Sequence, residues 1–179
     1  MNGLLTIYAR GADWAGRQAG WLLPTAARLV FAGVLFGYFW ASAGTKLDGV
    51  FTPSMGAYAQ IFPKAFEAVG YDASQMGLWH RLVVLAGAWA EYALPILIVL
   101  GLLTRLAAFG MVGFVLVQSL TDVVGHGAGA GAWFDRASDA LILDQRAFWV
   151  LLFLVLIVKG AGPLSADRLL AGAANRLAA

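Results

Sequence analysis

Residues 80–108 read HRLVVLAGAWAEYALPILIVLGLLTRLAA, and Glu91 is the one carboxylate in this apolar stretch. A helix needs about 20 apolar residues to cross a bilayer, and the run before Gly101 meets that length. Only residues 102–104 separate it from a second run of the same kind. The stretch therefore predicts two antiparallel transmembrane helices joined by a very short turn.

Glu91 is the candidate functional residue of this stretch. The rise of an α-helix places it about 16 Å from His80 on the same face, near the middle of a hydrocarbon core about 30 Å thick. A charged group there costs about 2.5 kcal/mol or more, so a retained carboxylate indicates a function. The alternative is an architectural carboxylate that bonds a neighbouring helix. Pro95 cannot donate a hydrogen bond to the Glu91 carbonyl, which predicts a bend beside the carboxylate.

The composition indicates an all-α integral membrane protein built as one four-helix bundle. Of the 179 residues, 61% are hydrophobic and 12% are charged, whereas soluble domains carry about 25% charged residues. The net charge of +2 does not indicate nucleic acid as a partner, and the lipid bilayer is the expected one. The chain has no cysteine, which excludes cysteine-ligated metal and covalently attached c-type haem.

The apolar runs divide the chain into a transmembrane domain, residues 21–160, and two flanking segments. We expect membrane spans at about residues 21–46, 80–101, 105–124 and 142–159. Residues 1–20 form either an interfacial helix or a cytoplasmic tail, and residues 161–179 form a cytoplasmic tail with a short helix capped by Ser165. Within the long connection before the second span, residues 57–66 predict one surface helix that caps the bundle, the alternative being a flexible loop.

Two patterns concern packing and orientation. Aligning Arg28 with Arg105 also aligns Gly33 with Gly110 and Ser42 with Ser119, which suggests that the bundle consists of two repeated helical hairpins. Small residues between Gly33 and Gly44 favour close helix packing, with homo-oligomerisation as a second use. Seven basic residues on one side against five on the other predict that both termini are cytoplasmic.

Several polar residues are expected to converge on Glu91 at the outer half of the bundle. Gln118, Asp122 and His126 follow one another at intervals of four along the third span, so they form one polar stripe. We group them with His80, Lys46 and Trp89 as ligand-binding candidates, and we assign Glu91 as the catalytic proton acceptor. A quinone headgroup fits this chemistry, because it needs hydrogen bonds, a proton route and aromatic walls. A metal held by His80, His126 and Asp122 is a weaker alternative, since no metal-ligand spacing is present.

The chain resembles the DoxX family of small four-helix bacterial membrane proteins. The segment LGLLTRLAA, residues 100–108, and the tail KGAGPLSADRLL, residues 159–170, carry the resemblance, together with Arg28, Gly33 and Glu91. The family is similar to the small subunit of thiosulfate:quinone oxidoreductase. The resemblance implies a location in the bacterial inner membrane and a role in membrane-linked redox chemistry.

These observations lead to a hypothesis about function. We expect a quinone-interacting subunit of a membrane oxidoreductase system, working with redox partner proteins. Two alternatives stay open at this point: a non-enzymatic membrane component for metal or peptide handling, and a scaffold for soluble redox partners.

Overall fold

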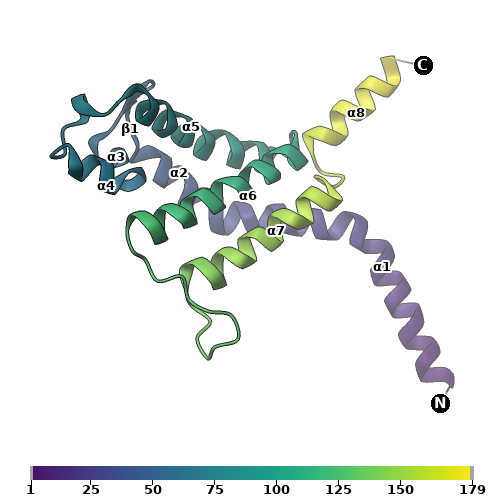
Figure 1. The fold of residues 1–179 in the computed structure, drawn as a ribbon. Coiled ribbons are helices and arrows are strands. Elements are labelled where there is room, and N and C mark those ends of the chain that lie inside the picture. Colours follow the sequence, from purple (N-terminus) through teal and green to yellow (C-terminus); the bar gives the residue numbers. More distant parts are fainter. Residues whose placement is uncertain (1, 178–179) are drawn as a thin grey trace.

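The computed structural model describes residues 2–177, and its helices confirm the all-α prediction (Figure 1). Within these residues, four helical segments are long and apolar enough to cross a membrane. The first is continuous through α1 (Asn2–Val30), the π-helix η1 (Phe31–Phe36) and α2 (Gly37–Gly44). The second is α5 (Leu78–Leu100), and the third is α6 (Thr104–Leu120) continued by the π-turn η3 (Thr121–Gly125). The fourth joins the π-turn η4 (Leu141–Gln145) to α7 (Arg146–Lys159).

The four segments pack side by side around an apolar core. The first segment contacts α5 and α7, while α6 contacts both α5 and α7. Phe31, Phe39, Ile98, Met111 and Phe153 are fully buried between them. The rings of Phe31 and Phe153 meet edge to face with 5.8 Å between centroids, a favoured geometry for aromatic pairs. Large apolar side chains elsewhere on these helices are exposed, as expected for surfaces that face lipid rather than water.

The turn between α5 and α6 confirms the predicted hairpin. Gly101 ends α5 with φ +68°, the left-handed conformation that glycine adopts without strain. Leu103 precedes α6 and does not cap it with its own side chain. The carboxylate of Asp167 does so instead, accepting hydrogen bonds from the backbone N–H groups of Leu103 at 2.7 Å and Thr104 at 3.0 Å.

Arg28 connects the helices at the same end of the bundle. Its guanidinium donates to the carbonyl oxygens of Ile98 and Val99 at the end of α5, and to that of Ala161 after α7. Ile98 and Val99 belong to the last turn of α5, where carbonyl oxygens lack the usual N–H partner four residues on, and Ala161 lies in the connection after α7. The Arg28 side chain, on the first span, therefore links that span to the end of α5 and to the connection after α7.

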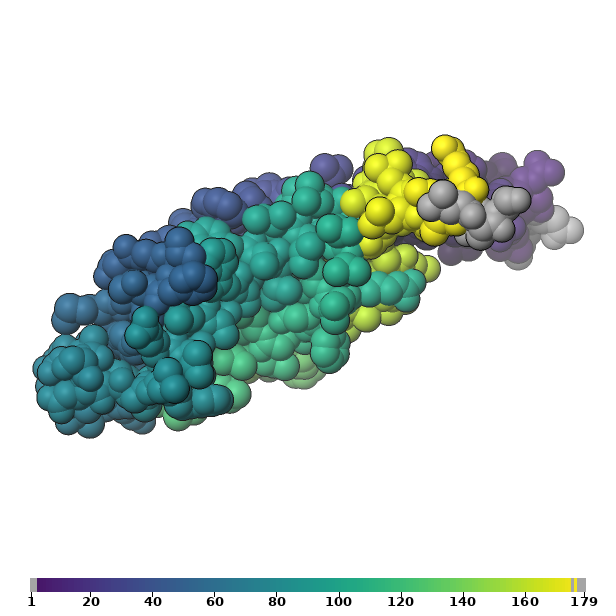
Figure 2. Space-filling model, turned by 90° about the horizontal axis from the view of Figure 1, so that it is seen from above, coloured from purple at the N-terminus to yellow at the C-terminus, as the bar shows by residue number. Residues whose placement is uncertain are grey.

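The first part of α1 and the C-terminal helix α8 (Ala166–Leu177) both leave the bundle at this end, which we call the terminal end (Figures 1 and 2). Residues 2–20 are helical and continuous with the first span. Pro24 lies inside α1, where proline removes a backbone hydrogen bond, and Figure 1 shows α1 bent away from the bundle. Ser165 caps α8, accepting from the Arg168 N–H at 3.3 Å.

The opposite end, the loop end, carries the long connection between the first two spans. It contains a small hairpin, β1 (Leu47–Gly49) and β2 (Thr52–Pro53), then α3 (Met55–Ile61), α4 (Pro63–Ala68) and the 3-10 turn η2 (Ala73–Gln75). The prediction of one helix over residues 57–66 was wrong, because Pro63 has no N–H to continue α3 and begins a new helix. Tyr58 and Phe66 pack against Val84, so both short helices cover the start of α5.

Candidate functional site

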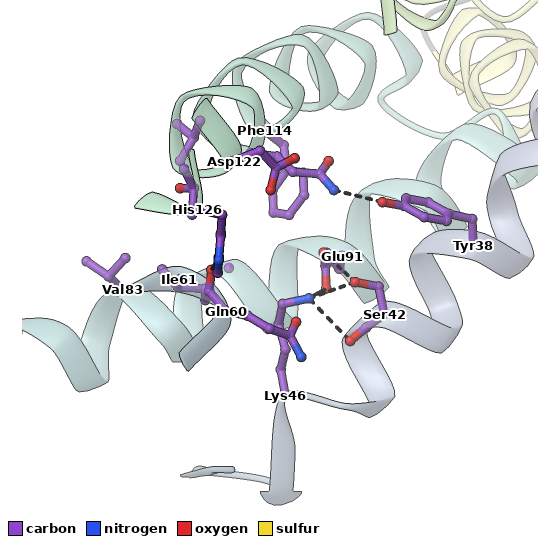
Figure 3. A pocket seen from close by; sticks show the side chains of 14 residues that line it. Tyr38, Ser42, Lys46, Gln60, Ile61, Val83, Glu91, Phe114, Asp122 and His126 are labelled. Atoms are coloured by element: carbon purple, nitrogen blue, oxygen red, sulfur yellow. Dashed lines mark hydrogen bonds and ion pairs between the residues drawn. The ribbon is translucent and has the colours of Figure 1, made fainter. Parts of the chain in front are cut away.

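A cavity of about 240 Å³ lies between α2, α5 and α6 on the loop-end side of the bundle, and α3 covers it. We call it the central cavity (Figure 3). Its lining is mixed: the polar residues are Tyr38, Ser42, Lys46, Gln60, Glu91, Gln118, Thr121, Asp122 and His126, and the remainder are Ile61, Val83, Gly87, Phe114 and Val117. A concave site with apolar walls and a few converging polar groups is the usual form of a small-molecule site.

A buried ion pair forms one wall of the cavity. The Nζ of Lys46 lies 2.8 Å from Oε2 of Glu91, and their side chains are only 8% and 2% exposed. Ser42 joins the pair: its hydroxyl donates to Oε1 of Glu91 at 3.2 Å and accepts from Lys46 at 2.7 Å. A further bond from Lys46 to the Ser42 carbonyl gives each of the three ammonium protons an acceptor. Figure 3 shows these side chains turned toward one another.

The local sequence explains how the two charges reach each other. The buried face of α5 follows Val84, Ala88, Glu91, Pro95 and Ile98, at alternating intervals of four and three residues, so Glu91 lies on the face that meets the other helices. Lys46 comes two residues after α2 ends, where it could have reached the membrane surface. Its side chain turns inward instead, because a carboxylate in a low-dielectric interior attracts an ammonium group strongly.

The predicted polar stripe on the third span lines the opposite wall. Gln118 donates from Nε2 to the Tyr38 hydroxyl at 2.8 Å, drawn as a dashed line in Figure 3, while its Oε1 is buried without a partner among the described residues. His126 contacts the carbonyl oxygen of Gln60 through Nε2 at 2.9 Å. Since a carbonyl oxygen only accepts, Nε2 carries the proton, and Nδ1 of the neutral ring is an acceptor.

Asp122 belongs to a second ion pair that the sequence did not reveal. Its Oδ2 lies 2.6 Å from Nη2 of Arg146, and Nη1 of Arg146 donates to the Ser119 hydroxyl at 3.0 Å. The Arg146 side chain is 3% exposed and lies outside the cavity lining, whereas Asp122 lines it. Each hairpin thus contains a serine, a basic and an acidic residue in contact, and the two serines, Ser42 and Ser119, are those aligned by the internal repeat.

Five of the seven predicted site residues line the central cavity: Lys46, Glu91, Gln118, Asp122 and His126. His80 and Trp89 do not. His80 lies against Phe62, with 4.8 Å between ring centroids, and its Nδ1 is buried without a partner among the described residues. Trp89 is exposed and donates to the Val50 carbonyl of the loop-end hairpin. Sequence reasoning placed the end of the first span, with Ser42, near Glu91 without assigning Ser42 to the site, and it did not include Tyr38 and Gln60, whose only signal was their polarity near the ends of apolar runs.

The structure shows where the three candidate metal ligands, His80, His126 and Asp122, lie. His126 and Asp122 line the central cavity, whereas His80 does not. Within residues 2–177, no three histidine, cysteine, aspartate or glutamate side chains are grouped closely enough to hold a metal ion together. The proposed ligands His80, His126 and Asp122 are therefore not gathered into one set.

Comparison with known proteins gives one match. A model of the DoxX family matches residues 23–124, which is more than half of the chain. This range covers the first span from residue 23 onward, all of the second span, the third span up to residue 124, and every residue that lines the central cavity except His126. No curated protein and no solved structure matches the chain.

Proposed function

The chain belongs to the DoxX family, and from this premise we propose that it binds a quinone headgroup in the central cavity as the membrane component of an oxidoreductase system. The observation that carries the proposal is the arrangement of the cavity itself. The Lys46–Ser42–Glu91 cluster and the Tyr38–Gln118 pair, two sets of hydrogen-bonding groups, face one space across apolar walls. A quinone has two oxygens on opposite sides of an apolar ring and needs a polar partner for each.

The Tyr38–Gln118 pair suits both redox forms of such a ligand. Oxidised quinone oxygens only accept hydrogen bonds, whereas quinol hydroxyls also donate them. The Oε1 of Gln118 has no partner among the described residues and can accept from a quinol. Turning the amide over presents Nε2 to a quinone instead, while the Tyr38 hydroxyl, which both donates and accepts, keeps its bond to the amide.

Glu91 is the proposed proton acceptor in the Lys46–Ser42–Glu91 cluster. Reduction of a quinone takes up two electrons and two protons, and quinol oxidation releases them. When Glu91 accepts a proton from a quinol hydroxyl, the negative charge moves to the ligand oxygen, and the ammonium group of Lys46, 2.8 Å from Glu91, balances it there, so no isolated charge is left in the membrane interior. Asp122 and His126 line the same cavity near the loop end and offer a proton route toward water. When Glu91 accepts a proton in quinol oxidation, the two electrons pass to a redox partner protein; in quinone reduction the partner supplies the electrons and Glu91 returns protons to the ligand.

Titration of purified protein with a short-chain ubiquinone analogue tests the proposal by isothermal calorimetry. We expect saturable binding that weakens about 10- to 100-fold in the Glu91→Gln/Lys46→Met double variant, because charge-assisted hydrogen bonds contribute about 1.5–3 kcal/mol. The double variant removes both charges together, so neither is left buried alone. Gln118→Met, which removes the amide and keeps the length of the side chain, should weaken binding about tenfold.

Glu67→Gln is the matched control, since Glu67 is an exposed carboxylate that does not line the cavity. Its affinity should equal that of the wild-type protein. Absence of saturable binding to the wild-type protein, or equal binding by the double variant, contradicts the proposal. Metal binding in place of quinone binding, lost in His126→Ala, would support the metal-handling alternative.

A further inference from the structure

A second depression, of about 430 Å³, lies at the terminal end between α1, the last residue of α7 and the start of α8. Trp21, Lys159 and Arg168 line it together with the Gly-rich connection between α7 and α8. We propose that this depression binds the phosphate of an anionic phospholipid, with Lys159 and Arg168 as its ligands. We call it the terminal pocket. Lipid binding in the terminal pocket does not depend on whether the central cavity binds a ligand.

The terminal pocket carries net positive charge, because Lys159 and Arg168 line it against one carboxylate, Asp167. Lys159 and Arg168 are exposed, and neither takes part in an ion pair, because the pairs among residues 2–177 are Lys46–Glu91 and Arg146–Asp122. Asp167 also lines the pocket, but its carboxylate oxygens accept the first N–H groups of α6. Partial burial opposes its ionisation, yet these hydrogen bonds and the charge of Arg28 lower the pKa of Asp167.

The pocket lies where a lipid phosphate is expected. Lys159 is the last residue of the fourth membrane span, and Trp21 lies on the first, half-exposed. Tryptophan, lysine and arginine concentrate at the level of lipid headgroups. Leu22 and Val158, next to these residues, are exposed apolar side chains that acyl chains can cover. Figure 1 shows that α8 and the N-terminal part of α1 diverge from this end of the molecule.

The pocket is formed before any ligand arrives. Gly162 has φ +77°, and a Cβ there would lie 3.1 Å from Cγ of Pro24, so the connection after α7 packs closely on α1. Gly20 lines the pocket too, and a Cβ built on it meets nothing within 4 Å. The space beside Gly20 is therefore open, and a larger side chain there fills the pocket without disturbing the bundle.

Native mass spectrometry of the full chain, exchanged into detergent with either phosphatidylglycerol or phosphatidylcholine, tests the proposal. We expect preferential retention of phosphatidylglycerol by the wild-type protein. Each basic residue near a membrane surface strengthens binding of anionic lipid about fivefold, so Lys159→Gln/Arg168→Gln should weaken retention about 25-fold. Gly20→Leu keeps both charges and fills the space, and it should lower retention as well.

The matched control is Lys64→Gln/Arg136→Gln, which removes two exposed positive charges outside the terminal pocket. It should retain phosphatidylglycerol as the wild-type protein does. Equal loss in this control, or equal retention of both lipids by the wild-type protein, overturns the proposal. Displacement of the lipid by inorganic phosphate at equal concentration also overturns it, because the site would then bind the free anion rather than a lipid.

Discussion

Replacing Lys46 with methionine isolates the energetic role of the buried ion pair. The Glu91 side chain is 2% exposed, and Lys46→Met leaves its buried charge without a cationic partner. Glu91 keeps only the Ser42 hydroxyl, at 3.2 Å, as a donor. Breaking a buried pair by removing one partner costs about 3–5 kcal/mol, and insertion scales give a similar cost of about 2.5–3.5 kcal/mol for a charge at the centre of a membrane helix. We therefore expect Lys46→Met to lower the free energy of unfolding by about 3 kcal/mol.

The Lys46→Met/Glu91→Gln double variant should recover most of this loss. Replacing both members of a buried pair by uncharged groups of similar volume is often close to neutral, so the two substitutions should be strongly non-additive. The free energy of unfolding can be measured by titrating the protein in mixed micelles with dodecyl sulfate, with the near-ultraviolet circular dichroism of its seven tryptophans as the signal. The exposed Glu67→Gln control should change stability by no more than about 0.5 kcal/mol.

Two results refute this reasoning. A loss below about 1 kcal/mol for Lys46→Met would place the pair in the range of solvent-screened surface ion pairs. A double variant as unstable as the worse single variant would show that packing of the two side chains, rather than their charges, holds the cluster together.

Three further predictions concern the ends of the helices. As the pH falls from about 5 toward 3, the wild-type protein should lose thermal stability more steeply than Asp167→Asn. The folded pKa of Asp167 is lowered, so its stabilisation is complete above the unfolded pKa of about 3.9 and is lost as the pH falls through the folded value. Gly101→Ala should destabilise the protein by about 1–3 kcal/mol, measured by thermal unfolding, because φ is +68° and a Cβ would lie 2.6 Å from Cβ of Ser165. Arg146→Met should cost about 1–2 kcal/mol, less than Lys46→Met in the same micelle titration, because the Asp122 side chain is 29% exposed.

Each of these predictions has a result that contradicts it. Parallel pH profiles for the wild-type protein and Asp167→Asn would show that the carboxylate does not stabilise α6 through its charge. An unchanged melting temperature for Gly101→Ala would mean that the turn relaxes without cost. An Arg146→Met variant less stable than Lys46→Met would show that partial exposure does not screen Asp122.

The membrane spans could be predicted because their signal is local. A helix in lipid satisfies its own backbone hydrogen bonds, so an apolar run of sufficient length identifies it without knowledge of its neighbours. The turn at Gly101 and the cap at Ser165 depend on residues close in the chain for the same reason. Pro63 also carried a local signal. This proline determines where α3 ends, and the spacing of the aromatic residues does not.

The site was predicted less completely because α5 is apolar on every face. Periodicity cannot then show which residues face the other helices. His80 was grouped with Glu91 because helical spacing places both on one face, and Trp89 was grouped with them as an aromatic wall. The loop-end connection packs Phe62 on His80 and brings the Val50 carbonyl to Trp89. Both contacts join residues far apart in the chain, and the sequence held no trace of them.

Apolar length and the scarcity of charge identified a membrane bundle. The position of Glu91 near the middle of an apolar run identified it as a candidate residue, because the cost of placing a charge in lipid is a property of each segment alone. The sequence placed Lys46 among several candidates near that carboxylate but did not identify it as the partner in an ion pair. Lys46 is one of several basic residues near the ends of the spans, and Arg146 is another. Packing of the helices selected Lys46 for Glu91 and Arg146 for Asp122, because a charge interacts strongly only with groups that folding brings within a few ångströms in a medium of low dielectric constant.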